Sequence, residues 1–298
     1  MTRSATITRD LTLRLTALAV VVFVVLCWLF ADGLLWPWPL WNGASWVDSP
    51  LITYLLIVVM IWAGARQARR LPAQGLTLTY SDESRQTPGQ VSDPLVSKLL
   101  FGNVLASFLW LPLRFFLGRD WLSAGLHKVG NPAWTENGQA LAGFWKSAVA
   151  VNEAGAGPVT YDWYRRFLQY MLDHQWYTWF AKVVVWGEIL IGLGLLVGAL
   201  VGLAAFFGTF LNLNFGLAGT ASSNPILFAL GALLVLAWRT AGWWGLDRWL
   251  LPRLGTPWQS GDEFEAAFRV EPEPEPGPVV GPYAGSAPYR KKKRRWGV

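Results

Sequence analysis

Long apolar runs separated by short polar segments dominate the sequence. A transmembrane helix needs about 20 predominantly apolar residues, and six runs reach or approach that length. They cover residues 15–31, 51–65, 99–129, 176–200, 201–219 and 225–243. The pattern therefore predicts an all-α integral membrane protein with six transmembrane helices.

The composition supports this class. Of the 298 residues, 53% are hydrophobic and 15% are charged, whereas a soluble domain carries roughly 25% charged residues. These values exclude a disordered protein and disfavour an ordinary soluble enzyme. The single cysteine, Cys27, lies in an apolar run and rules out an intramolecular disulfide, a CxxC redox pair and a thiolate metal cluster.

Lysine and arginine are unevenly distributed between the runs, and cytoplasmic loops carry the excess of these bases. The second connection, 66–98, is rich in arginine, whereas 32–50 and 220–224 contain neither base. Both termini are therefore expected in the cytoplasm. Arginines precede the first run, as in a signal peptide, but no small-x-small cleavage site follows it, so a retained helix is favoured.

These features divide the chain into four parts. Residues 1–70 form an N-terminal transmembrane hairpin, and 71–98 form a polar cytoplasmic loop. Residues 99–254 form a four-helix membrane domain. Within it, 130–175 is expected to make an extracytoplasmic cap, because apolar side chains recur there at helical spacing between polar ones. Residues 255–298 form a Pro-rich basic cytoplasmic tail.

The net charge of +6 arises at the end of the tail, and the rest of the chain is neutral. Six bases lie there: Arg290, Lys291, Lys292, Lys293, Arg294 and Arg295. A basic cluster beside a membrane favours binding to the anionic head groups of the lipid bilayer, at about 1 kcal/mol per base. A topology signal is the alternative, and no nucleic acid is expected as a partner.

Charged side chains inside the third run are the first candidates for chemistry. Four polar residues fall on one face of a helix there: Arg119, Asp120, Ser123 and His127. Arg114 falls on the opposite face. A charge inside a bilayer costs at least about 2.5–3.5 kcal/mol on insertion scales, so such residues are usually paired and often functional. An ion pair that only orients helices is the alternative.

Glu188 is the second candidate, because it lies among valine, leucine and isoleucine residues of the fourth run. It is expected either to be protonated, since a low dielectric disfavours the carboxylate, or to pair with Arg114 or Arg119. Both states are compatible with proton exchange with a quinone-like ligand, and both are compatible with a purely structural link between helices.

Contacts to such a ligand are assigned to four residues of these runs. They are Arg114, Trp186, Asn212 and Asn214. Glycines at four-residue spacing around Asn212 are typical of closely packed helices with Asn bonding across, so a structural role is the alternative for it.

Neither a metal nor a haem is expected. His127 and His174 are the only histidines, so a bis-histidine haem would need both, and the sequence contains no HExxH, no Ser-His-Asp grouping and no glycine-rich phosphate loop. Any electron chemistry therefore needs a bound organic carrier, for which we expect a quinone, or a partner subunit.

Several motifs resemble the DoxX/DoxD membrane family. They are RFFLGRDWLSAGLHKVGNPAW (114–134), GFW (143–145), GEILIGLGLLVG (187–198), LNLNFGLAGTASSNPILF (211–228) and WGLDRWLLPRL (244–254). The resemblance covers about residues 99–254. It implies a DoxX-like four-helix bundle, and an activity like that of the DoxD subunit of thiosulfate:quinone oxidoreductase.

The resemblance predicts a membrane subunit that transfers electrons from a small sulfur donor such as thiosulfate to membrane quinone. The protein is then expected in the cytoplasmic membrane of a bacterium or archaeon, with additional membrane or redox subunits as partners. Arg119, His127 and Lys128 would attract the anion, and Glu188 and Asp120 would handle the quinone protons. The family supplies no catalytic residues, so the charges inside the runs carry the assignment of catalysis to Glu188, Asp120, Arg119 and His127.

Two alternatives come from other classes. One is a non-catalytic transmembrane subunit that scaffolds a respiratory or photosynthetic electron-transport complex, and the other is a small-molecule or lipid carrier.

Overall fold

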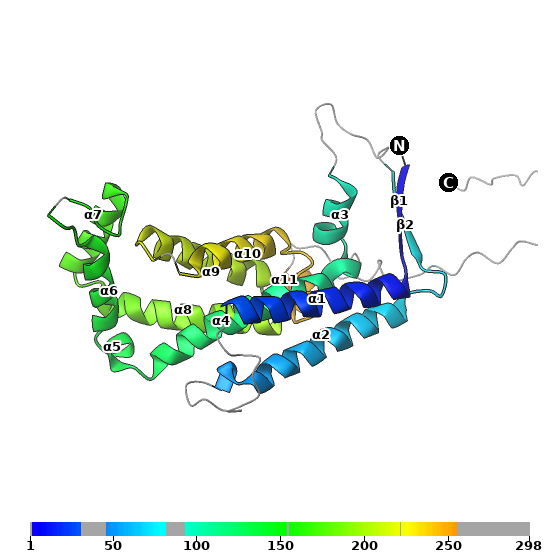
Figure 1. The fold of residues 1–298 in the computed structure, drawn as a ribbon, viewed down its shortest axis with the longest axis horizontal. Helices are drawn as coiled ribbons and strands as arrows, with labels where there is room; N and C mark the ends of the chain where they lie inside the picture. Colours follow the sequence, from blue (N-terminus) through cyan, green and yellow to red (C-terminus); the bar gives the residue numbers. More distant parts are fainter. Residues whose placement is uncertain (1, 31–45, 82–92, 154, 221, 255–298) are drawn as a thin grey trace, which may run out of the picture.

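The structure, a computed structural model, is largely helical (Figure 1). It describes residues 2–30, 46–81, 93–153, 155–220 and 222–254. The predicted basic tail, 255–298, and the lipid contact expected from it lie outside the described residues.

Three described helices are long and apolar enough to cross a membrane: α1 (Arg9–Phe30), α2 (Pro50–Arg70) and α8 (Tyr177–Val197). A fourth span results if α3 (Leu95–Gly102) and the helix Val104–Val129, bent by 76° against each other, count as one. The last two predicted spans correspond to shorter apolar helices, α9 (Val201–Leu217) and α10 (Asn224–Leu236). A helical membrane protein is thus confirmed, and the described residues contain three or four candidate spans by length and composition.

A two-stranded antiparallel sheet stands beyond the ends of α1 and α2 (Figure 1). It pairs β1 (Thr2–Ile7) with β2 (Leu76–Ser81). The sheet is a small addition to an otherwise helical fold, and the sequence analysis, which treated 71–98 as a polar loop, did not predict the strand Leu76–Ser81 within it. Apolar and polar residues alternate along β2 as in a half-buried strand, but its partner strand precedes the first helix, so no local pattern revealed the pairing. We call this end of the molecule the sheet end.

Helix α4 (Leu111–Val129) packs closely along α8, because glycines remove side chains from the contact. A Cβ added to Gly192 would lie 2.5 Å from the backbone nitrogen of Leu122, and one added to Gly125 would lie 3.0 Å from the nitrogen of Ile189. Small residues at such positions let helix backbones approach each other in membranes. This close approach brings the polar groups of α4 and α8 within bonding distance.

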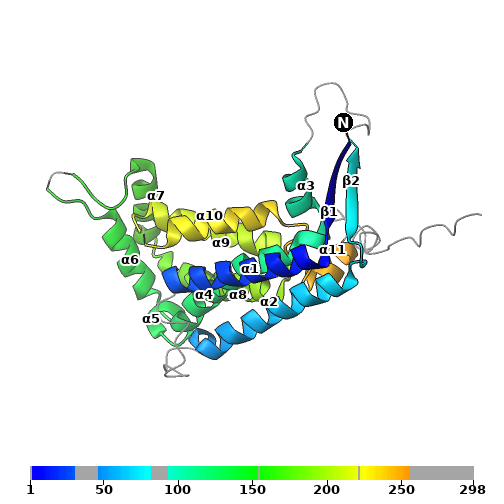
Figure 2. The ribbon, with the colours of Figure 1, turned by 45° about the vertical axis from the view of Figure 1, so that its right-hand side comes forward.

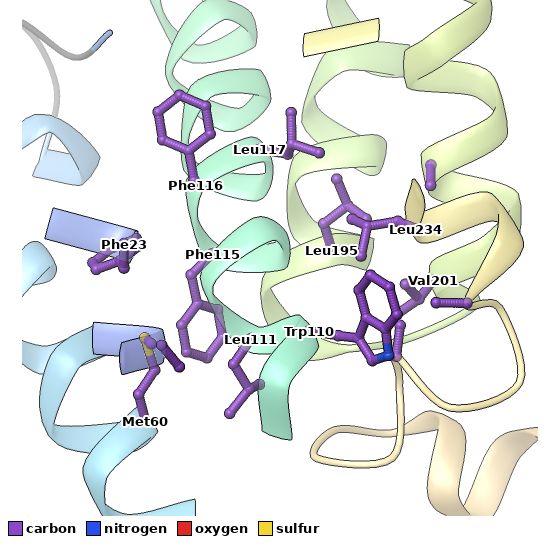
Figure 3. Packing of buried hydrophobic residues seen from close by; sticks show 14 of the residues in the cluster. Phe23, Met60, Trp110, Leu111, Phe115, Phe116, Leu117, Leu195, Val201 and Leu234 are labelled. Atoms are coloured by element: carbon purple, nitrogen blue, oxygen red, sulfur yellow. The ribbon is translucent and has the colours of Figure 1, made fainter. Parts of the chain in front are cut away.

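The largest buried cluster joins the hairpin to the later helices (Figure 3). Phe23 of α1 and Met60 of α2 lie on one side of α4, next to Phe115, whereas Leu195 of α8 and Leu234 of α10 lie on the other side. Helix α4 is therefore the central element, with the hairpin on one side and the remaining bundle on the other.

A helical cap covers the end of α8 opposite the sheet (Figure 2). It comprises α5 (Pro132–Thr135), α6 (Gln139–Val149) and α7 (Asp162–Asp173). The helical spacing seen in 160–175 corresponds to α7, which buries its apolar side against α6 through residues such as Leu168 and Trp145. We call this end the cap end. At the sheet end, the last described helix is α11 (Asp247–Leu254).

Candidate functional site

An ion pair between α4 and α8 lies towards the cap end. The Lys128 ammonium donates to both carboxylate oxygens of Glu188, at 2.9 and 2.7 Å. The Glu188 side chain is 2% exposed and that of Lys128 is 21% exposed. The Lys128 ammonium also bonds the Ala124 carbonyl at 3.1 Å and lies 5.3 Å from the ring centroid of Trp134. A nearly buried carboxylate is thus neutralised by one well-placed cation.

The prediction that Glu188 pairs with Arg114 or Arg119 was therefore wrong. Position 128 lies three residues after Gly125, on the side of α4 that contacts α8, so its ammonium reaches Glu188. Arg119 points to a different neighbour.

The Arg119 guanidinium is directed at the start of α2. It donates from Nε to the Val47 carbonyl at 2.7 Å, from Nη2 to the Ser49 carbonyl at 3.1 Å, and from Nη1 to the Thr53 hydroxyl. The Arg119 side chain is buried. Its charge is therefore satisfied by neutral oxygens, and its effect is to hold the hairpin to α4.

Three further ionisable groups lie around this junction. The His127 Nε2 lies 3.6 Å from Oδ2 of Asp48, which belongs to the 3-10 helix η1 (Trp46–Asp48) before α2. The His127 side chain is half exposed. Asp120 is partly buried, and the charges of Asp48 and Lys128 act on it.

We call these five residues the cap-end cluster: Asp48, Asp120, His127, Lys128 and Glu188. Sequence reasoning missed Asp48, which lies just before an apolar run, and assigned Lys128 only to anion attraction. The cluster holds three carboxyl groups, one ammonium and one imidazole. It is therefore an acid–base set and not the cationic site expected for an anionic donor.

Arg114 lies near the opposite end of α4, in a separate place. Its guanidinium donates to the carbonyls of Leu195 at 3.0 Å and Leu196 at 3.3 Å, near the end of α8, and to those of Ala241 at 2.9 Å and Trp244 at 3.3 Å. The side chain is fully buried. Arg114 thus donates to carbonyls that have no backbone hydrogen-bond donor at a helix end and in a turn.

Asp247 completes this arrangement, which we call the Arg114–Asp247 clamp. Its two carboxylate oxygens accept from the backbone N–H groups of Leu200 at 2.6 Å and Val201 at 2.9 Å, at the start of α9. Burial raises the pKa of Asp247, whereas these bonds and the charge of Arg114 act in the opposite direction. The clamp joins the ends of α4, α8 and α9, so the structure gives Arg114 a structural role in place of the predicted ligand contact.

The other predicted ligand contacts are separated from one another. Trp186 is 57% exposed on the outside of α8. Asn214 accepts from the hydroxyl of Tyr164 at 3.1 Å and so links α9 to the cap; burial raises the pKa of Tyr164 to about 12. Asn212 is 3% exposed, and neither of its amide atoms has a hydrogen-bond partner.

The predicted residues therefore do not form one shared polar chamber. Arg119 contacts the start of α2, Arg114 belongs to the clamp, and Glu188 pairs with Lys128. Two cavities among the described residues have other linings, one apolar between α9, α10 and α11, and one at the end of α2. Within the described ranges, no group of three or more His, Cys, Asp or Glu side chains could hold a metal ion.

Comparisons of the chain with protein-family models, with curated proteins and with solved structures give no match. The resemblance of residues 99–254 to the DoxX/DoxD family therefore stays a prediction.

Proposed function

We propose that this chain is a DoxX/DoxD-like subunit of a membrane oxidoreductase, in which the cap-end cluster moves protons between water at the membrane surface and a quinone in the bilayer. The observation that carries the proposal is the Lys128–Glu188 pair, which is almost buried between two apolar helices. Ionisable side chains at such positions are costly, and they often mark proton or substrate pathways.

The arrangement of the cluster suits a proton relay. The His127 side chain is half exposed, so its imidazole is in contact with water. It contacts Asp48, and the charge of Asp48 acts on Asp120. The charge of Lys128 acts on both Asp120 and Glu188. The groups thus connect the solvent-facing side of α4 with its buried side.

The chain also offers a group that fits a quinone. A quinone carbonyl needs a hydrogen-bond donor in apolar surroundings, and the buried amide of Asn212 is a donor without a partner. A bound quinone supplies two-electron redox chemistry, and its reduction to quinol takes up two protons. In this proposal Asn212 holds the carbonyl, and Glu188 and Asp120 hold the protons.

Binding of a sulfur donor such as thiosulfate is assigned to a partner subunit. The cap-end cluster holds three carboxyl groups and a single ammonium, which already pairs with Glu188, and the Arg119 guanidinium donates to oxygen atoms of the chain itself. A small anion is therefore not attracted to the cluster. This division agrees with the expectation of additional redox subunits.

Quinone reduction by the protein purified together with its partner subunits tests the proposal. This complex is reconstituted in proteoliposomes with thiosulfate and a short-chain quinone, and quinol formation is followed by absorbance. Glu188→Gln and Asp120→Asn should each lower the rate by about 10²-fold or more, as expected for loss of a general acid. Glu136→Gln, which changes an exposed acid of the cap, should not. Full activity in both cluster variants would refute the relay, and absence of thiosulfate-dependent turnover would refute the redox assignment.

A non-catalytic scaffold is the second candidate, and the sheet favours it. The two strands stand apart from the bundle, and in the described part of the chain each pairs only with the other. Open strand edges are templates for pairing with another chain. Purification in mild detergent separates the candidates, because a stable large assembly whose activity is unchanged in Glu188→Gln and Asp120→Asn supports scaffolding.

A further inference from the structure

Helix α7 of the cap carries a second apolar face that the cap leaves exposed. Its buried face, which includes Leu168 and Met171, packs within the cap. The second face carries Trp163, Phe167 and Tyr170, which are 62%, 45% and 50% exposed. These three aromatic residues lie at positions i, i+4 and i+7 and therefore share one side of the helix. The apolar part of α7 is thus wider than the area that the cap covers.

Polar side chains occupy the remaining side of α7. Arg166 and Gln169 are exposed there, and the Arg165 guanidinium pairs with the Asp162 carboxylate at 2.7 Å. The surface of α7 outside the cap is therefore amphipathic, with aromatic rings on one side and charged groups on the other. Helices of this kind lie in the membrane–water interface, where the rings of Trp and Tyr are buried and their polar atoms stay hydrated.

The exposed aromatic face of α7 continues onto α8. The ring centroid of Tyr170 lies 5.8 Å from that of Trp176, which lies 5.8 Å from that of Trp179. From Trp179 an exposed apolar stripe follows α8 at helical spacing through Trp186 and Leu190. Because α8 is one of the candidate membrane spans, this stripe is a surface that faces lipid. The aromatic face of α7 is thus continuous with a lipid-facing surface.

The direction of α7 suits a place at the membrane surface. In Figure 1 and Figure 2, α7 runs across the direction of α8 at the cap end. A helix that lies across the end of a membrane span follows the plane of the bilayer surface.

We infer that α7 lies in the membrane–water interface, with Trp163, Phe167 and Tyr170 inserted among the lipid head groups. The cap then rests on the bilayer instead of standing in water. Lipid is the occupant of the aromatic face because that face joins the lipid-facing stripe of α8 without a break. The inference is independent of the proposed redox function, because it uses none of the residues of the cap-end cluster.

The accessibility of spin labels on the two sides of α7 tests the inference. A cysteine is introduced by Phe167→Cys or, as the matched control on the polar side, by Gln169→Cys, in the full-length protein with Cys27→Ser. In phospholipid nanodiscs, collisions of each label with oxygen, which concentrates in the bilayer, are compared with collisions with a water-soluble nickel chelate. The label at position 167 should lie about 5–10 Å below the aqueous boundary, and the label at position 169 should lie in water.

Two results of this measurement would overturn the inference. Free access of the nickel chelate to position 167 would show that the aromatic face stands in water. Exclusion of both reagents from position 167 would show that protein, and not lipid, covers it.

A second arm uses the wild-type chain and so covers a labelled variant that does not fold. The protein is placed in nanodiscs that contain a phospholipid with a photoreactive diazirine near its head group, and the adducts are located by mass spectrometry after irradiation. Adducts are expected within residues 163–170 as well as around Trp179, where the stripe of α8 begins. Adducts around Trp179 with none in 163–170 would contradict the inference.

Discussion

Removing only one member of the Lys128–Glu188 pair should destabilise the protein more than removing both. In Lys128→Met, the Glu188 carboxylate remains in a site where it is 2% exposed, and both of its bonds to the ammonium, at 2.7 and 2.9 Å, are lost. In the double variant Lys128→Met/Glu188→Gln, no charge remains in the site. The comparison therefore isolates the cost of an uncompensated buried charge.

The magnitude follows from the exposure of each partner. Breaking a buried pair on one side costs about 3–5 kcal/mol, and we expect about 3 kcal/mol for Lys128→Met because the ammonium is partly exposed. Glu188→Gln should cost less, about 1–2 kcal/mol, since Lys128, at 21% exposure, can turn towards water. The double variant should lie within about 1 kcal/mol of the wild type, which gives a coupling of about 3–5 kcal/mol between the two sites.

Reversible unfolding in mixed micelles, followed by tryptophan fluorescence, measures these free energies. The chain holds 20 tryptophans, so the signal is strong. Glu136→Gln serves as the control for loss of one acid at the cap end. Additive effects of the two substitutions would refute the reasoning, because they would show that the two side chains do not stabilise each other.

Three other predictions concern packing and protonation. Gly192→Ala should destabilise the bundle by about 1–3 kcal/mol, because the added carbon meets the backbone of α4. Gly187→Ala on the same helix, with open space around it, should be neutral or stabilising in the same unfolding assay. The pKa of Tyr164 is raised to about 12, so its native phenol contributes stability that is complete below about pH 10 and is lost towards pH 12. Ionisation of the phenol is followed by ultraviolet absorbance, and the titration of Tyr164→Phe is subtracted from that of the wild type. Ionisation of Tyr164 at pH 10 would contradict its burial. Burial also raises the pKa of Asp247 above its usual range. Thermal stability should therefore increase as the pH falls through this raised pKa, and Asp247→Asn should abolish the increase.

The helices could be predicted from the sequence because their pattern is local. The apolar runs 15–31, 51–65 and 176–200 correspond to α1, α2 and α8. Strand β2 could not be predicted in this way, because a six-residue strand depends on a partner, and its partner is separated from it by the whole hairpin.

The correct partner of Glu188 could not be predicted because it depends on how far one helix extends past another. Counted from residue 129 of the predicted run 99–129 and from residue 176 of the run 176–200, Arg119 and Glu188 lie about equally deep in the membrane, and Lys128 lies at its surface. In the structure α8 extends beyond α4 to contact α5 and α6, so Glu188 lies level with the end of α4. The packing of the cap sets that offset, and the sequences of α4 and α8 alone do not determine it.

The Arg114–Asp247 clamp has a consequence for biosynthesis. The acceptors of Arg114 follow it by 81 to 130 residues along the chain. While the ribosome is still making α8 and α9, residues 241 and 244 have not been synthesised, so the guanidinium cannot yet bind their carbonyls. Insertion of α4 into the bilayer must therefore precede its final docking, and closure of this end of the bundle awaits nearly the whole nascent polypeptide.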